Sequence, residues 1–124
     1  MSTGKLLIVD DEKIAMKNLE HAMKKEGHEV TASQSGANAL ALLEKQSFDV
    51  VLTELRMEKV DGMQILKRCR ENHPDTEVVL VTGHATLANA VEAMKHGAFH
   101  YLAKPYRLED LARTLRSVVQ GSPA

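Results

Sequence analysis

The sequence contains few of the residues that cross-link, anchor or embed a protein. It has one cysteine, Cys69, which excludes an internal disulfide and fits a reducing compartment. It has no tryptophan and so lacks the commonest aromatic anchor of binding hot spots. No apolar run approaches the length of a membrane span, and residues 1–5 lead into an apolar run without a signal-peptide pattern. We therefore expect a cytoplasmic domain with no membrane partner.

The charge balance is also unremarkable. Sixteen basic residues face 17 acidic ones, a net charge of -1, so bulk electrostatics gives no reason to expect direct nucleic-acid binding. The 124 residues are enough for one domain with a hydrophobic core. We predict that this domain spans residues 1–119 and that residues 120–124, with the sequence Gln-Gly-Ser-Pro-Ala, form a linker-like tail.

Short apolar runs alternate with segments of helical period. The runs that predict strands are Lys5–Val9, Glu29–Ala32, Val50–Thr53, Glu77–Val81 and His100–Ala103. Helical faces follow them, marked by apolar residues within 15–23, 39–43, 63–69, 87–94 and 108–119. Five such units predict an α/β fold with a doubly wound parallel sheet of five strands. The run at Glu29–Ala32 has little apolar content, which places it at an edge.

Polar side chains follow four of these runs, and they are the candidates for a site. Asp10 and Asp11 follow the first run, Glu54 the third, Thr82 the fourth and Lys104 the fifth. In a doubly wound sheet a ligand binds beyond the carboxyl ends of the strands, so we expect these side chains to lie together there.

The adjacent acids Asp10 and Asp11 repel each other unless a cation compensates their charge. Mg²⁺ is the natural compensator because it prefers oxygen ligands and water. The alternative is an acidic helix start, with Asp11 or Glu12 as the cap of the first helix.

Thr82 is followed by Gly83 and His84, and the small glycine leaves room for an anion to approach backbone N–H groups. His84 would then lie at the mouth of the site. The alternative is that Thr82 caps the fourth helix, a role for which Thr86 competes.

Lys104 can offer its ammonium to a carboxylate or a phosphate, although a solvated lysine at a turn is the commoner case. Pro105 follows it, and a cis peptide there would aim Lys104 inward. Elsewhere, Asp61 and Gly62 predict a turn that starts the third helix. The six histidines form no pair at metal-ligand spacing, and neither a Ser/His/Asp arrangement nor a glycine-rich nucleotide loop is present, so we expect no enzyme.

Four segments taken together resemble the receiver domain of two-component response regulators, over residues 5–119. They are Ile8–Glu12, Asp49–Met57 followed by Asp61–Gly62, Val81–Gly83, and Gly97–Tyr106. The sequences of residues 82–85 and 101–106 are most similar to those of receivers of the nitrogen-regulation type, which precede ATPase and DNA-binding domains. The resemblance implies a flavodoxin-like, CheY-like (βα)5 fold with strand order 2-1-3-4-5.

The resemblance also implies roles. Asp10 and Asp11 would hold Mg²⁺, together with the residue at position 54 and the backbone carbonyl of Arg56. Thr82 and Lys104 would contact phosphoryl oxygens. Tyr101 would turn inward when Thr82 is drawn to the phosphate. The fourth helix, fifth strand and fifth helix would form the output face for an attached domain, a partner or a second copy of the chain, and a sensor histidine kinase or phosphotransfer protein would supply the phosphoryl group.

Two residues depart from the family pattern. Glu54 stands where receivers have the phosphoacceptor aspartate, and Glu58 stands where a proline is usual. The extra methylene moves the Glu54 carboxylate outward, toward the place of the phosphoryl oxygens, which disfavours in-line transfer. Glu58 adds an acid that would strengthen or relocate Mg²⁺ binding. The sequence does not distinguish a natural Glu54 from an engineered replacement of aspartate.

Three hypotheses follow. In the first, Glu54 partly mimics the phosphorylated state, the domain is a pseudo-receiver that regulates transcription through its output face, and Mg²⁺ binding is weakened or altered. In the second, the domain is still phosphorylated by a histidine kinase, on Glu54 or another acid, and acts as an ordinary switch. In the third, the fold binds a flavin or nucleotide, against which the few aromatics and the missing glycine-rich loop argue. We favour the first.

Overall fold

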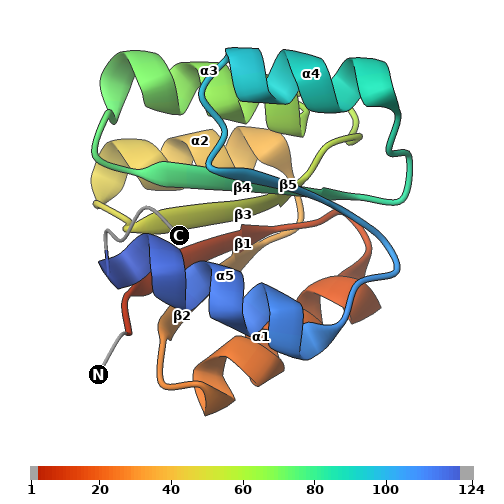
Figure 1. Cartoon of the computed structure of the whole chain (residues 1–124). Helices are drawn as coiled ribbons and strands as arrows, with labels where there is room; N and C mark the ends of the chain where they lie inside the picture. Colours follow the sequence, from red (N-terminus) through yellow and green to blue (C-terminus); the bar gives the residue numbers. More distant parts are fainter. Residues whose placement is uncertain (1–2, 121–124) are drawn as a thin grey trace.

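The computed structural model describes residues 3–120, which form a five-stranded sheet with helices on both faces (Figure 1). The strands are β1 (Lys5–Val9), β2 (Glu29–Ser33), β3 (Val50–Glu54), β4 (Glu77–Thr82) and β5 (His100–Ala103). The helices are α1 (Lys13–Lys25), α2 (Gly36–Lys45), α3 (Gly62–Asn72), α4 (Leu87–Lys95) and α5 (Leu108–Gln120). All strand pairs are parallel in the order β2-β1-β3-β4-β5, so the predicted topology and the edge position of β2 are confirmed.

Three strands are one residue longer than the apolar runs predicted, because backbone pairing continues past the last apolar residue. β2 reaches Ser33, which pairs with Val9, and β3 reaches Glu54, which pairs with Val81. β4 reaches Thr82. Glu54 and Thr82 are therefore the last residues of their strands, where the sheet fixes their backbones.

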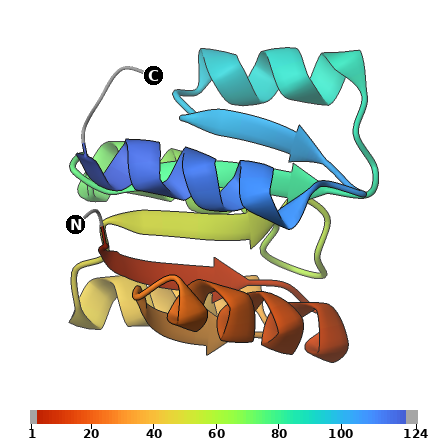
Figure 2. The same cartoon turned by 60° about the horizontal axis from the view of Figure 1, so that its bottom comes forward.

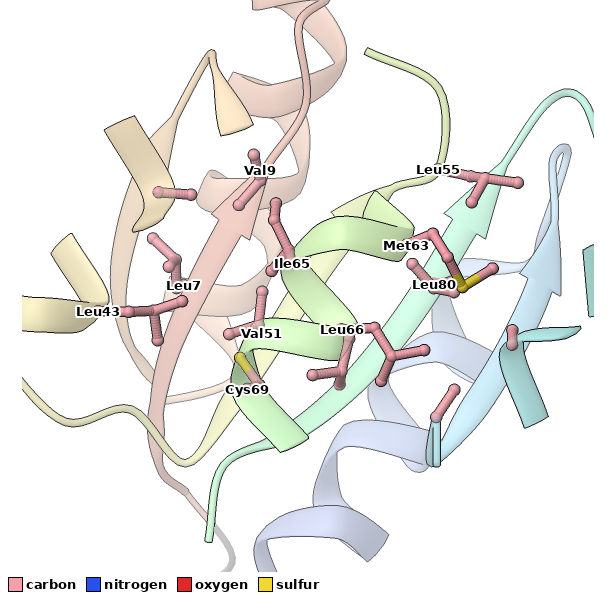
Figure 3. Packing of buried hydrophobic residues seen from close by; sticks show 14 of the residues in the cluster. Leu7, Val9, Leu43, Val51, Leu55, Met63, Ile65, Leu66, Cys69 and Leu80 are labelled. Carbon is pink, nitrogen blue, oxygen red and sulfur yellow. The ribbon is translucent and has the colours of Figure 1, made fainter. Parts of the chain in front are cut away.

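The sheet separates two hydrophobic layers. Figures 1 and 2 show α2, α3 and α4 on one face and α1 and α5 on the other. The first layer packs Leu7, Val51 and Leu80 against Ile65 and Leu66 of α3, all fully buried (Figure 3). The second layer packs the alternate strand residues against α1 and α5. Strands buried on both faces explain the nearly continuous apolar runs in the sequence.

The helix boundaries have local causes. Gly27 and Gly97 follow α1 and α4 with φ of 97° and 93°, a left-handed conformation that glycine adopts readily. Asp61 is the N-cap of α3 and forms a capping box with Gln64, which confirms the predicted turn. At the other end of the chain, α5 extends to Gln120, and the remaining part of the predicted tail, residues 121–124, lies outside the described residues.

Helix α4 is present as predicted, but most of the apolar residues that marked it point to solvent. Leu87 is 82% exposed, Met94 51% and Val91 45%. The helix packs on the sheet through Ala93, which is fully buried. α4 therefore presents an apolar face that no other part of residues 3–120 covers.

The packing of α5 generates a stability prediction. Leu115 is fully buried among residues of β1, β3 and β4, so Leu115→Ala should lower the free energy of unfolding by about 2–5 kcal/mol. Leu108 lies on the same helix but is half exposed, and Leu108→Ala should change the stability by no more than about 0.5 kcal/mol. Urea unfolding followed by circular dichroism measures both. Equal losses for the two variants would contradict the assignment of the buried face.

Candidate functional site at the carboxyl end of the sheet

Three strand ends are joined by one lysine. Nζ of Lys104 lies 3.0 Å from Oδ2 of Asp10 and 3.0 Å from Oε1 of Glu54. Both acids are buried, and the lysine is about a quarter exposed. The side chains come from positions just after β1, at the end of β3 and just after β5, so the predicted meeting of these three residues at one edge of the sheet is observed.

Glu54 accepts hydrogen bonds from four groups. Oε1 faces Lys104, and Oε2 accepts from the backbone N–H groups of Leu55 at 2.8 Å and Arg56 at 3.3 Å. The fourth partner is the side chain of Thr82. Burial opposes ionisation, but the hydrogen bonds with Thr82, Lys104 and Arg56 outweigh it and hold the pKa of Glu54 below its usual value. Both oxygens of the carboxylate are therefore engaged, Oε1 by Lys104 and Oε2 by two backbone N–H groups.

Lys104 and Asp10 are held by further contacts. Burial disfavours the charged lysine, but hydrogen bonds to Asp10 and Glu54 outweigh this and raise the pKa of Lys104. Oδ1 of Asp10 accepts from the backbone N–H of Glu12 at 2.9 Å. The Lys104–Pro105 peptide is cis, and the backbone N–H of Lys104 donates to the backbone carbonyl of Thr82 at 2.9 Å.

Thr82 belongs to the site and does not cap α4. It is fully buried, and its Oγ1 accepts from the backbone N–H of His84 at 3.0 Å. Thr86 takes the N-cap position of α4 instead. His84 and Gly83 are exposed at the mouth, where a Cβ added at position 83 would meet no atom within 4 Å. The space beside Gly83 is therefore open.

Tyr101 lies on β5 with its ring against the hydrophobic layer under α2, α3 and α4. Its hydroxyl is buried and has no hydrogen-bond partner among residues 3–120. The Tyr101 side chain is thus turned inward, although no group within residues 3–120 forms a hydrogen bond with its hydroxyl.

Other predicted residues lie apart from the cluster. Asp11 and Glu58 are exposed, and neither has a hydrogen bond or ion pair to Lys104. Gly62 is a position whose importance the sequence did not reveal. A Cβ there would collide with the backbone oxygen of Glu54, so only glycine lets α3 start this close to the site. In the sequence, the Asp61-Gly62 dipeptide predicts only a turn that starts the third helix.

The comparisons with known proteins decide the family. The family model of the response regulator receiver domain matches residues 6–116. The chain belongs to this family. It is 33% identical over 120 residues to the transcriptional regulatory protein GlrR of Escherichia coli, covering 96% of this chain and 27% of that protein. It is 36% identical over 110 residues to the DNA-binding transcriptional regulator NtrC of the same species, covering 89% and 24%. The resemblance to receivers of the nitrogen-regulation type is confirmed.

One solved relative shows the chemistry of the family. It is a response regulator of Burkholderia pseudomallei with a phosphorylated aspartic acid, a calcium ion and citrate, 28% identical, with a TM-score of 0.83 over 94% of this chain and 71% of that one. Receiver domains are signalling modules and generally bind Mg²⁺. This chain spans about a quarter of the length of the curated regulators that it matches. None of the helices in residues 3–120 is long and apolar enough to cross a membrane.

The lowered pKa of Glu54 predicts how stability depends on pH. An unfolded glutamate has a pKa of about 4.3, so on acidification the unfolded chain takes up this proton before the folded chain does. The stabilisation is present above the unfolded pKa and is lost as the pH falls through the folded pKa. The stability of the native chain relative to Glu54→Gln should therefore decrease below about pH 5 in urea unfolding. Parallel pH profiles for the two proteins would contradict the ion pair.

Proposed function

We propose that the domain is a pseudo-receiver in which Glu54 replaces the phosphoacceptor and partly mimics the phosphorylated state. The observation that carries this proposal is the pairing of Glu54. Without any phosphoryl group its carboxylate hydrogen-bonds with Thr82 and Lys104, the residues to which the family resemblance assigns the phosphoryl oxygens.

The mimicry is partial, for reasons of charge and geometry. A phosphoryl group carries close to two negative charges and three acceptor oxygens, whereas Glu54 carries one charge and two oxygens. Two of its four hydrogen bonds go to the backbone of its own strand end, at Leu55 and Arg56. Only the remaining two hold Thr82 and Lys104, so the equilibrium between receiver states is biased and not fixed.

The position of Tyr101 supports the same interpretation. In the family, an inward aromatic residue at this position accompanies a threonine drawn to the phosphate. Here Thr82 forms a hydrogen bond with Glu54, and the Tyr101 hydroxyl is buried. An unpaired buried hydroxyl costs free energy, so a contact elsewhere must favour the inward side chain.

The output face is proposed to lie on α4, β5 and α5. Leu87, Val91 and Met94 follow one another at helical spacing on α4 and are exposed, which suits the docking of an apolar partner surface. We expect the occupant to be an output domain that controls transcription, a partner protein or a second copy of the chain, in the cytoplasm. A sensor histidine kinase or phosphotransfer protein would be the upstream partner, if one is retained.

An ordinary phospho-switch is the second candidate. It requires an oxygen of Glu54 to attack a phosphoryl donor, and both oxygens are already engaged in hydrogen bonds. Its carboxylate is also one methylene too far out for the in-line position. No observation favours the flavin or nucleotide hypothesis.

Phosphorylation is tested by intact mass after incubation with Mg²⁺ and acetyl phosphate. We expect no phosphoryl mass on the native chain and a gain for Glu54→Asp, because the shorter acid restores the family geometry. Glu54→Gln serves as the control for modification at other positions. A phosphoryl mass on the native chain that is absent from Glu54→Gln would overturn the pseudo-receiver.

The coupling between Glu54 and Tyr101 is tested by NMR of the tyrosine ring. Thr82→Ala removes one of the two contacts that impose the bias, so the Tyr101 ring signals should shift toward a more exposed environment. Thr31→Ala, on the opposite edge strand β2, is the matched control and should leave them unchanged. Unchanged Tyr101 signals in Thr82→Ala would argue that Glu54 does not act through Thr82.

A further inference from the structure

The acidic site has to be neutralised, and the family does this with a divalent cation. Asp10, Asp11 and Glu54 lie at neighbouring strand ends, and two of them are buried. Carboxylates gathered in this way repel each other unless a positive charge lies close by. The structure offers one such charge within hydrogen-bond distance of the buried pair, the ammonium of Lys104.

We infer that Lys104 is the resident counter-ion of this site and that, in contrast to other receivers, the native domain does not take up Mg²⁺ there. The ammonium lies 3.0 Å from an oxygen of each buried acid and so bridges them as a metal ion would. The cis peptide at Lys104–Pro105 and the backbone hydrogen bond from Lys104 to Thr82 accompany this placement.

The ligands expected for Mg²⁺ do not fit the ion. Both oxygens of Glu54 already accept hydrogen bonds, Oε1 from Lys104 and Oε2 from two backbone N–H groups. Asp10 is engaged at both oxygens, by Glu12 and by Lys104. Mg²⁺ demands nearly ideal octahedral geometry and gives up its water reluctantly, so it competes poorly for oxygens that already have partners.

Asp11 remains, but it is exposed and stands alone. Within residues 3–120 no group of three or more His, Cys, Asp or Glu side chains is placed to hold a metal ion. One solvated carboxylate does not make a site, because Mg²⁺ gives up its water reluctantly and a single exposed ligand offers little in exchange. The carboxylate of Glu54, with its extra methylene, contacts both Lys104 and Thr82.

This inference concerns the cation and does not depend on what the domain signals. It is tested with MgCl₂ alone, by following backbone amide signals of the native chain in a titration to millimolar concentration. We expect no saturable shift at Asp10, Asp11, Glu12 or Arg56. Saturable shifts confined to these residues would overturn the inference, whereas the pseudo-receiver would still be judged by its phosphorylation.

Two variants test whether Lys104 and Glu54 cause the exclusion. Lys104→Met keeps the length of the side chain and frees acceptor positions on both buried acids, so MgCl₂ should now raise its melting temperature and shift the same amides. Glu54→Asp withdraws the carboxylate and should acquire the same response. Lys45→Met, which removes an exposed lysine of α2, should stay unresponsive like the native chain. A lack of Mg²⁺ response in both site variants would contradict the role given to Lys104.

Discussion

The ion pair of Lys104 with Asp10 and Glu54 is the interaction on which the rest of the site depends. It joins the ends of β1 and β3 to the segment that follows β5, so it spans four adjacent strands of the sheet, β1, β3, β4 and β5. Each partner is desolvated, and breaking such a pair leaves an uncompensated charge in a poorly hydrated place. The backbone N–H groups around the carboxylates and the hydroxyl of Thr82 complete the hydrogen bonding that the buried charges need.

One methylene changes how this interaction is used. The structure of the Burkholderia relative holds a phosphorylated aspartic acid and a calcium ion, one a negatively and the other a positively charged addition to the protein. In this chain Glu54 and Lys104 carry both charges within the protein. The ammonium offsets part of the negative charge of the buried acids, which lessens the need for either group. This links the proposed loss of phosphorylation and the proposed loss of Mg²⁺ binding to a single cause.

Much of the fold followed from the sequence, because buried parallel strands and glycine-ended helices leave strong local patterns. The positions of Asp10, Glu54, Thr82 and Lys104 at strand ends also predicted that they lie together. Local patterns could not show which face of α4 is buried, since that depends on packing between Ala93 and the sheet. Local patterns also could not predict the hydrogen bonds that both Glu54 oxygens accept, because side-chain rotamers and the backbone of neighbouring residues decide those contacts.

The central claim is that Glu54 and Lys104 stabilise each other, and a double-mutant cycle measures this directly. The free energies of unfolding of the native chain, Glu54→Gln, Lys104→Met and the double variant are compared at neutral pH. The account predicts that the two changes are coupled by more than about 1 kcal/mol, as expected for a hydrogen bond between charged groups. Effects that add within about 0.5 kcal/mol would show that the two side chains do not depend on each other and would contradict it.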